Sequence, residues 1–195
     1  MQNEKTQLRR LLRDRRRSLS SAEVTEKSRL ILERLLGIAS FQQATTIVLY
    51  SADENEVQTE AIWQEAVRQN KAVYYPRITT DKTTLEFVRR LPGHQLVPGT
   101  FGILTPPGNA LLMSVSETDV VLTPGVGFDH YGHRLGRGRG YYDRAFRGVL
   151  AGALRIALAY ESQLVSAIPT APDDEPVHYV VTETRLIRCV SESLH

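Results

Sequence analysis

The stretch RLGRGRGYYDR, residues 134–144, brings together residue types that could bind a phosphate-bearing ligand. Glycine can adopt positive φ and lets the backbone approach a ligand closely, and main-chain N–H groups in such turns bind anions. Arg137 and Arg139 can donate charge-assisted hydrogen bonds to phosphate oxygens. Asp143 would repel a bare anion, so its presence favours a divalent cation such as Mg²⁺ between carboxylate and phosphate. Three glycines alternate with the arginines, namely Gly136, Gly138 and Gly140.

The spacing of these glycines matches neither of the two common nucleotide-binding fingerprints, GxxxxGK[ST] and GxGxxG. Three interpretations of the stretch therefore stay open: a phosphate-binding loop, an Arg-Gly segment that contacts RNA, and a solvated structural turn. RNA-binding Arg-Gly segments usually occur in long disordered repeats, whereas this one is short. Tyr141 and Tyr142 could stack on a heterocycle or fill the core.

The segments around the glycine stretch alternate between strand and helix patterns. Alternating strands and helices predict a single α/β domain over residues 1–195. We expect three layers, α/β/α, of which the central one is a mostly parallel, Rossmann-like sheet. Ligands bind such sheets at the carboxyl ends of the strands, and the glycine stretch follows a strand and precedes a helix. We expect helices at 4–17, 22–36, 58–70 and 141–151, strands at 45–51, 71–77, 84–90, 118–124, 154–160, 177–183 and 185–190, and mostly loop at 91–118.

Local signals fix several of these boundaries. Ser20 and Glu23 form the pattern of a capping box before the second helix, and Gly37 is a typical residue to follow its end. Pro76 is expected to end the second strand. The first helix places Leu8, Leu11 and Leu12 on one face and packs on the domain, while its arginine run, 10–17, is expected to be solvated.

Composition narrows the class of protein and of ligand. The chain has 195 residues and a net charge of +2, with arginines concentrated near the N-terminus and in the glycine stretch. Two local basic patches on a nearly neutral protein favour a small anionic ligand over a long polyanion. The single cysteine, Cys189, excludes an internal disulfide and a multi-cysteine zinc site. No apolar run approaches the roughly 20 residues that span a bilayer, so we expect a soluble, cytoplasmic protein.

The segment TPGVGFDHYGHRLGRGRGYYDR, 123–144, resembles the signature of the 5-formyltetrahydrofolate cyclo-ligase family. The family pattern is approximately P-G-[VL]-[AG]-F-D-x-x-G-x-R-L-G-x-G-x-G-[YF]-Y-D, and this sequence matches its fixed positions. Four further segments agree with the family in order and spacing, so the resemblance spans nearly the whole chain. They are KTQLRRLLRDRR (5–16), LYSADENEVQTEAI (49–62), YYPRI (74–78) and LAYESQLVSAIP (158–169).

The resemblance implies an enzyme that uses ATP and Mg²⁺ to convert 5-formyltetrahydrofolate to 5,10-methenyltetrahydrofolate, releasing ADP and phosphate. ATP would phosphorylate the formyl oxygen, N10 would attack the activated carbon, and phosphate would leave as the ring closes. Phosphoryl transfer depends mainly on positioning and charge neutralisation, which arginines, backbone amides and Mg²⁺ can provide.

The resemblance also assigns roles to residues. Arg137 and Arg139 would be catalytic, and Asp143 and, more weakly, Asp174 would hold the metal. The ATP site would comprise Lys5, Arg9, Arg134, Leu135, Gly136, Arg137, Gly138, Arg139, Gly140, Tyr141 and Tyr142. The folate site would comprise Ser51, Glu56, Arg77, Arg137, Gly138, Arg139, Gly140 and Tyr141.

One region departs from the family pattern. The segment PDDEPVHYVVTE, 172–183, has Asp173 in place of an aromatic or histidine partner of Asp174, and His178 where a second aspartate is common. A non-catalytic folate-binding relative is therefore one alternative, and an RNA-binding protein that uses the Arg-Gly loop is the other. On the main interpretation we expect a monomer that acts on small molecules, with no nucleic-acid or membrane partner.

Overall fold

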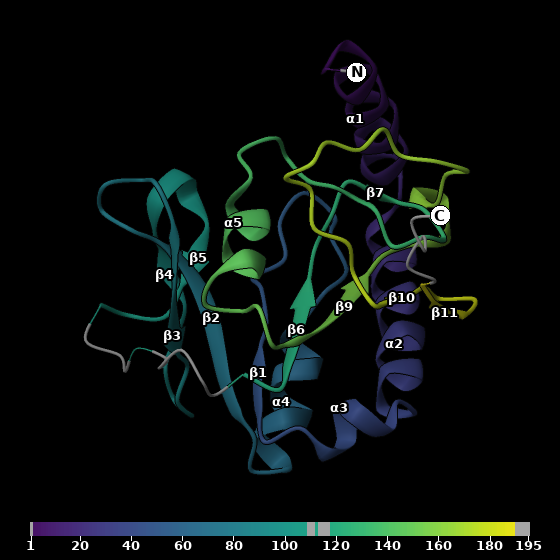
Figure 1. The fold of residues 1–195 in the computed structure, drawn as a ribbon. Coiled ribbons are helices and arrows are strands. Elements are labelled where there is room, and N and C mark those ends of the chain that lie inside the picture. Colours follow the sequence, from purple (N-terminus) through teal and green to yellow (C-terminus); the bar gives the residue numbers. More distant parts are fainter. Residues whose placement is uncertain (1, 109–111, 113–117, 190–195) are drawn as a thin grey trace.

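The computed structural model describes residues 2–108, 112 and 118–189, which fold around one central sheet with helices on both faces (Figure 1). The helices are α1 (Gln2–Arg17), α2 (Ser21–Leu36), α3 (Ala39–Gln43), α4 (Glu60–Arg68) and α5 (Tyr141–Arg147). The strands of the sheet are β1 (Thr46–Val48), β2 (Ala72–Ile78), β3 (Leu85–Arg89), β6 (Val120–Thr123), β9 (Leu154–Leu158), β10 (Tyr179–Val181) and β11 (Leu186–Arg188). Outside it lie two ribbons, β4 (Val97–Pro98) with β5 (Leu104–Thr105) and β7 (Gly127–Phe128) with β8 (Arg134–Leu135), and two 3-10 turns, η1 (Thr100–Gly102) and η2 (Glu161–Gln163).

The strand order of the sheet is β11-β10-β9-β6-β1-β2-β3. Its inner strands run parallel, and the edge strands β3 and β11 pair antiparallel with their neighbours. The mostly parallel α/β sheet predicted from the sequence is confirmed. The chain first builds outward from β1 through β2 to β3, and then returns to the other side of β1 with β6 and β9. The order thus reverses between β1 and β6, the point at which such sheets bind ligands.

Successive residues of β1 point to opposite faces of the sheet and contribute to two separate cores. Ile47 packs with residues of α2, α3 and α4, whereas Val48 packs with Ala145 and Phe146 of α5. Each fully buried aliphatic or aromatic side chain of this kind stabilises the fold by roughly 1.5–3 kcal/mol relative to leaving it exposed. The two cores explain the continuous apolar run of β1, because both of its faces are covered.

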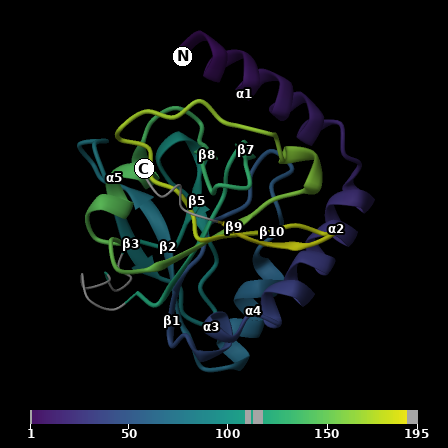
Figure 2. The same cartoon turned by 45° about the vertical axis from the view of Figure 1, so that its right-hand side comes forward.

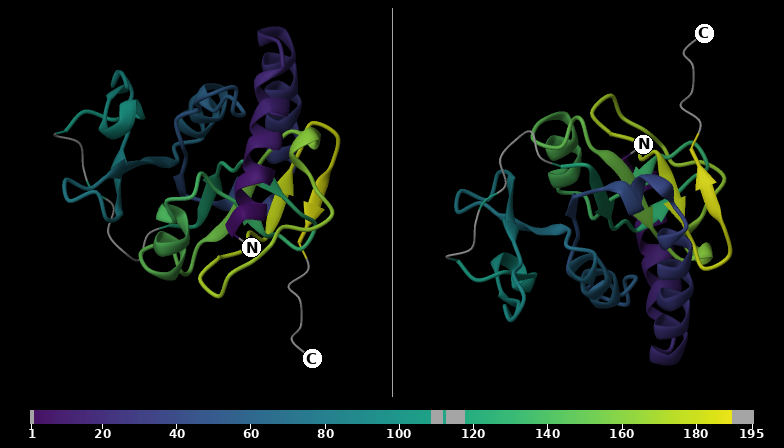
Figure 3. Two further views of the ribbon diagram at one scale, coloured as in Figure 1. Left: turned by 90° about the horizontal axis from the view of Figure 1, so that it is seen from above. Right: turned by 90° about the horizontal axis from the view of Figure 1, so that it is seen from below.

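α1 lies at the end of the sheet toward which β6 points, and leads into α2 along the side of the molecule (Figures 1 and 2). Seen from above, α1 crosses over the ends of the strands (Figure 3). Its buried Leu12 packs with Val126, Leu135 and Ile168. Leu11, which we expected on the same face, is 48% exposed, so the inward face of α1 is narrower than predicted.

The predicted start of α2 is confirmed: Ser20 caps the helix, and Ser20 and Glu23 form the capping box in both directions. Gly37 does follow the last residue of α2, but with φ −80° it is not in the left-handed conformation typical of that position. α5 ends at Arg147, four residues earlier than expected, because Gly148 leaves helical geometry at φ −116° and ψ −113°. Among the described residues, no helix is both long and apolar enough to cross a bilayer.

Pro76 does not end β2, as we had expected, because the strand continues to Ile78. The carbonyl of Val73 accepts a hydrogen bond from Arg90, on the side of β3, and the carbonyl of Tyr74 accepts one from Leu49, on the side of β1. Successive residues alternate in direction, so Pro76 faces the side of β1, where the last pair in register is Val48 with Tyr74. The N–H group that proline lacks would therefore have no partner in the β1–β2 ladder. Beyond this point β1 and β2 separate.

Candidate functional site

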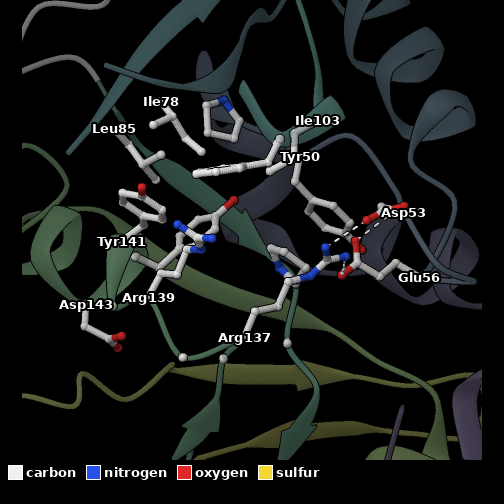
Figure 4. A pocket seen from close by; sticks show the side chains of 18 of the residues that line it. Tyr50, Asp53, Glu56, Ile78, Leu85, Ile103, Arg137, Arg139, Tyr141 and Asp143 are labelled. Carbon is white, nitrogen blue, oxygen red and sulfur yellow. Dashed lines mark hydrogen bonds and ion pairs between the residues drawn. The ribbon is translucent and has the colours of Figure 1, made fainter. Parts of the chain in front are cut away.

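A cleft of about 510 Å³ opens at the ends of β1, β2 and β6 (Figure 4). It lies between α1, the β4–β5 ribbon and the glycine stretch 134–144, called the glycine loop below. Every site residue nominated from the sequence lines this cleft, although the positions lie far apart in the chain. They are Lys5, Arg9, Ser51, Glu56, Arg77, Arg134, Leu135, Gly136, Arg137, Gly138, Arg139, Gly140, Tyr141, Tyr142, Asp143 and Asp174. What each of them binds stays a prediction.

The glycine loop uses its glycines for two different reasons. Gly138 and Gly140 have φ of +99° and +65°, the conformation that side chains disfavour. Gly136 does not share this conformation; a Cβ there would lie 2.9 Å from Nη1 of Arg134, so the position needs space. Arg9 of α1 donates from Nε to the carbonyl of Gly136 over 2.9 Å, which joins the N-terminal helix to the loop.

Arg137 connects the glycine loop to the segment that follows β1. Its Nη1 lies 2.8 Å from Oδ2 of Asp53, and its Nη2 lies 2.9 Å from Oε1 of Glu56 (Figure 4). Both terminal nitrogens therefore face carboxylates, although we had expected this side chain to meet phosphate.

Glu56 is buried, with 6% of its surface exposed, and also faces the guanidinium of Arg16 in α1 at 3.4 Å. Its second oxygen accepts a hydrogen bond from the backbone N–H of Asp53 over 3.1 Å. Burial raises the pKa of Glu56 above that of an ordinary glutamate, and the charges of Arg137 and Arg16 act in the opposite direction. A carboxylate in this setting can accept hydrogen bonds from a ligand in the cleft.

Arg139 points to the opposite side of the cleft from Arg137. Its guanidinium carbon lies 4.0 Å from the ring centroid of Phe101, a cation–π contact. The neighbouring Tyr141 donates its hydroxyl to the carbonyl of Lys82 over 2.9 Å. These contacts join the glycine loop to the β2–β3 turn and to the β4–β5 ribbon.

The two nominated metal ligands both lie in the wall of the cleft, and both already have cationic partners. Oδ1 of Asp143 lies 2.9 Å from Nη2 of Arg134. Asp174 pairs with Lys5 through Oδ2, which also accepts a hydrogen bond from the N–H of Ala171. No cluster of three or more acidic, histidine or cysteine ligands occurs in the part of the chain that the structure describes.

The remaining nominated residues have separate environments. Arg77 pairs across strands with Glu86, its partner in register on β3. Ser51 lies just beyond β1 and is half-buried. Leu135 is buried in the core with Leu12, so its side chain serves packing as well as lining the cleft. Tyr142 packs with the α5 core, while Arg134 lies over its ring at 5.4 Å.

The segment that departs from the family pattern is held by ion pairs of its own. Asp173 pairs with Arg147 over 2.6 Å, and Glu175 pairs with Arg155 over 2.8 Å. Nδ1 of His178 accepts the backbone N–H of Arg155 over 2.9 Å. The changed residues are thus anchored to α5 and β9, and Asp174 between them lines the cleft.

Among the residues that the sequence did not nominate, Arg13, Asp53 and Phe101 line the cleft, and Arg16 contacts Glu56 from behind it. The expectation that the whole run 10–17 is solvated was wrong, because Arg16 is only 1% exposed. The signal was present, since Arg16 follows Leu8 and Leu12 at intervals of four and so shares the inward helical face. Asp53 and Phe101 lie in loops, where no periodic pattern indicates direction.

Comparisons with known proteins agree with this arrangement. The profile of the 5-formyltetrahydrofolate cyclo-ligase family matches residues 1–183. The 5-formyltetrahydrofolate cyclo-ligase of Haemophilus influenzae is 33% identical over 88% of this chain and 93% of its own, and that of Mus musculus is 30% identical over 90% and 92%. The structure of Aquifex aeolicus 5,10-methenyltetrahydrofolate synthetase is 29% identical, with a TM-score of 0.84 over 98% of this chain and 96% of its own.

Proposed function

The chain belongs to the 5-formyltetrahydrofolate cyclo-ligase family, and we propose that its cleft binds 5-formyltetrahydrofolate and ATP together and closes the folate ring. The observation that carries this proposal is the convergence of all the nominated residues on one cleft at the point where the strand order reverses. The cleft has a carboxylate side at Glu56 and a cationic side at the glycine loop, as two different substrates require.

The reaction has two covalent steps. The formyl oxygen of the folate attacks the γ-phosphorus of ATP, the bond to the bridging oxygen breaks, and ADP leaves. N10 then attacks the formyl carbon, which carries a good leaving group, and phosphate departs as the N10–carbon bond forms and the N10 proton is lost. Neither step needs a protein nucleophile, so the residues act by positioning and by neutralising charge.

We assign the ends of the cleft from their charges. Glu56 accepts N–H donors of the pterin, and Ser51, close to it in the chain, also lines the cleft. Lys5, Arg9, the loop backbone and Arg139 face the phosphates. Arg139 is the better candidate to meet the transferred phosphoryl group, because Arg137 is already held by two carboxylates. Arg77, which lines the cleft from β2, suits an anionic group such as the glutamate of folate.

Mg²⁺ usually reaches a protein with its nucleotide and needs only one or two carboxylates, so Asp143 and Asp174 fit it. Asp143 uses Oδ1 for Arg134 and for a longer contact with the N–H of Glu175, which leaves Oδ2 available among the described residues. Bound there, the ion would neutralise charge on the phosphates. Because one chain supplies every nominated residue, we propose a monomer; a cytoplasmic location stays a prediction from the sequence.

The test is the rise in absorbance of the methenyl product, measured with 5-formyltetrahydrofolate, ATP and Mg²⁺ together and with each omitted in turn. The proposal requires product only from the full mixture. Turnover without ATP, or folate binding without turnover, would contradict it. RNA binding is not favoured, because Arg134 is buried and both Arg134 and Arg137 are paired with carboxylates in the cleft.

A further inference from the structure

The turn between β1 and α4 has an unfavourable backbone conformation. Glu54 and Asn55 have φ of +49° and +59°, two consecutive non-glycine residues in the left-handed region. Asparagine tolerates this conformation, but glutamate does so less well, and such residues persist only where their surroundings impose them. The next residue is Glu56, so the strained turn directly precedes the carboxylate proposed to receive the folate.

The contacts that impose this conformation come from the end of α1 and from the residues that follow it. The Nε of Arg16 donates to the carbonyl of Glu54 over 3.0 Å. The side-chain amide of Asn55 donates to the carbonyl of Leu19 over 3.0 Å and more weakly to that of Arg16. The side chain of Arg16 therefore holds Glu54, and main-chain carbonyls at and just after the end of α1 hold Asn55.

The guanidinium of Arg16 also contacts Glu56 and the loop that follows β6. Nη1 of Arg16 lies 3.4 Å from Oε1 of Glu56 and 3.4 Å from the carbonyl of Gly125, which follows β6. A second buried side chain, the amide of Gln163, donates to that carbonyl over 2.8 Å. Arg16 thus contacts the strained turn, the substrate-facing carboxylate and the β6 loop with one guanidinium that is 1% exposed.

We propose that Arg16 is a positioning residue, which fixes the turn at 53–56 and thereby orients the Glu56 carboxylate toward the folate. This inference rests on the proposed function of Glu56. An arginine suits the position because its planar guanidinium can donate in several directions at once, which a lysine ammonium on a flexible stem does less well. Arg16 lines no part of the cleft itself, so it acts through Glu56 and not by touching substrate.

The groups that face Glu56 decide how its charge depends on pH. They are Arg16 from α1, Arg137 from the glycine loop, with which Asp53 also pairs, and the phenols of Tyr50, Tyr142 and Tyr160. Burial raises the pKa of each phenol, so the phenols stay neutral, and burial also raises the pKa of Glu56 against the effect of its two cations. Removal of one of its two cations makes Glu56 easier to protonate.

The experiment compares the KM for each substrate, as a function of pH, in wild type, Arg16→Met and Arg16→Lys. At neutral pH Arg16→Met should raise the KM for 5-formyltetrahydrofolate by about tenfold or more, with little change in the KM for ATP. In Arg16→Met the acidic limb of folate binding should move to higher pH. Arg16→Lys should restore part of the KM for folate and part of the pH profile. Arg10→Met, an exposed arginine of the same helix, should match wild type, and Leu12→Ala measures what loss of helix packing alone does.

The outcomes separate this inference from the function on which it rests. If Glu56→Gln raises the KM for folate but Arg16→Met leaves both the KM and the pH profile unchanged, the positioning role is wrong. The same conclusion follows if Arg16→Met only reproduces Leu12→Ala, with both substrates affected alike. If Glu56→Gln itself has no effect on folate, the role proposed for Glu56 fails first. Should Arg16→Met not fold, Arg16→Lys decides, because a lysine variant with the wild-type KM for folate would overturn the inference that the guanidinium positions the turn.

Discussion

Arg139 lies on the ring of Phe101, 4.0 Å from its centroid, and it is not paired with a carboxylate among the residues that the structure describes. Arg137, two residues earlier, has Asp53 and Glu56 on its two terminal nitrogens. Two arginines that looked equivalent in the sequence thus face different sides of one cleft. Their substitution should have different consequences.

For Arg139→Ala we expect kcat/KM with ATP to fall, with a loss of transition-state stabilisation of roughly 1.5–3 kcal/mol, the usual worth of a hydrogen bond to a charged group. Arg139 is exposed, so the free energy of unfolding should change by less than about 0.5 kcal/mol. Steady-state kinetics and denaturant unfolding check the two values. Arg188→Ala, in the edge strand β11, is the control, and equal kinetics in both variants would rule out the phosphate role.

Arg137→Ala should affect both substrates. It removes a partner from the buried Glu56 as well as a positive charge from the loop, so the KM for 5-formyltetrahydrofolate should rise together with a fall in kcat. The discriminating measurement is the ratio of the folate effect to the ATP effect, which should be larger in Arg137→Ala than in Arg139→Ala. An identical ratio would mean that loss of the Arg137–Glu56 pair does not affect folate binding.

Glu56→Gln should raise the KM for folate and leave that for ATP nearly unchanged. In wild type the Glu56 carboxylate can bind folate above its pKa, and this binding is lost as the pH falls through that pKa. Because burial raises that pKa, folate binding should weaken at a higher pH than an ordinary glutamate would require. The variant should lack this acidic limb, and Glu26→Gln, an exposed glutamate on α2, should keep it. If the acidic limb persists in Glu56→Gln, a group other than Glu56 causes it.

The sequence was sufficient to predict the layers and the location of the site. Apolar runs that end in polar loops predict buried parallel strands, and the glycine stretch lies after one of them. The antiparallel direction of the edge strands was also predictable, because β3 follows β2, and β11 follows β10, after connections too short for a parallel crossover. The path of β2 through Pro76 depends on where β1 stops, a tertiary fact. Arg16 was misjudged because a run of arginines was interpreted by its charge and not by its spacing.

Gly132 should be among the positions least tolerant of a side chain. Its φ is +90°, and a Cβ would lie 2.3 Å from the carbonyl oxygen of Val177 and 2.9 Å from Cβ of Cys189. Neither the backbone oxygen nor the strained conformation can be relieved by a rotamer change, so Gly132→Ala should cost about 2 kcal/mol or more of unfolding free energy. Gly152→Ala, where a Cβ meets nothing within 4 Å, should change it by less than about 1 kcal/mol. Similar midpoints in urea for both variants would contradict this account.

The role of Asp143 requires a test that separates metal binding from charge pairing, since its Oδ1 is already on Arg134. Asn preserves the shape and one oxygen but removes the charge that Mg²⁺ needs most. Loss of stability does not discriminate, because either role leaves the nearly buried Arg134 without its anion. The Mg²⁺ dependence of turnover does discriminate.

If Asp143 binds the ion, Asp143→Asn should abolish most turnover, raise the Mg²⁺ midpoint and recover partly in excess Mg²⁺. If it only pairs with Arg134, added Mg²⁺ should rescue nothing, and the loss should vary with ionic strength. Asp174→Asn should shift the midpoint less, because Asp174 is also held by Lys5 and the N–H of Ala171. Asp173→Asn is the matched control, since Asp173 is an adjacent, exposed carboxylate that pairs with Arg147 outside the cleft. Equal Mg²⁺ midpoints and comparable rates in wild type and Asp143→Asn would exclude the carboxylate from the metal site.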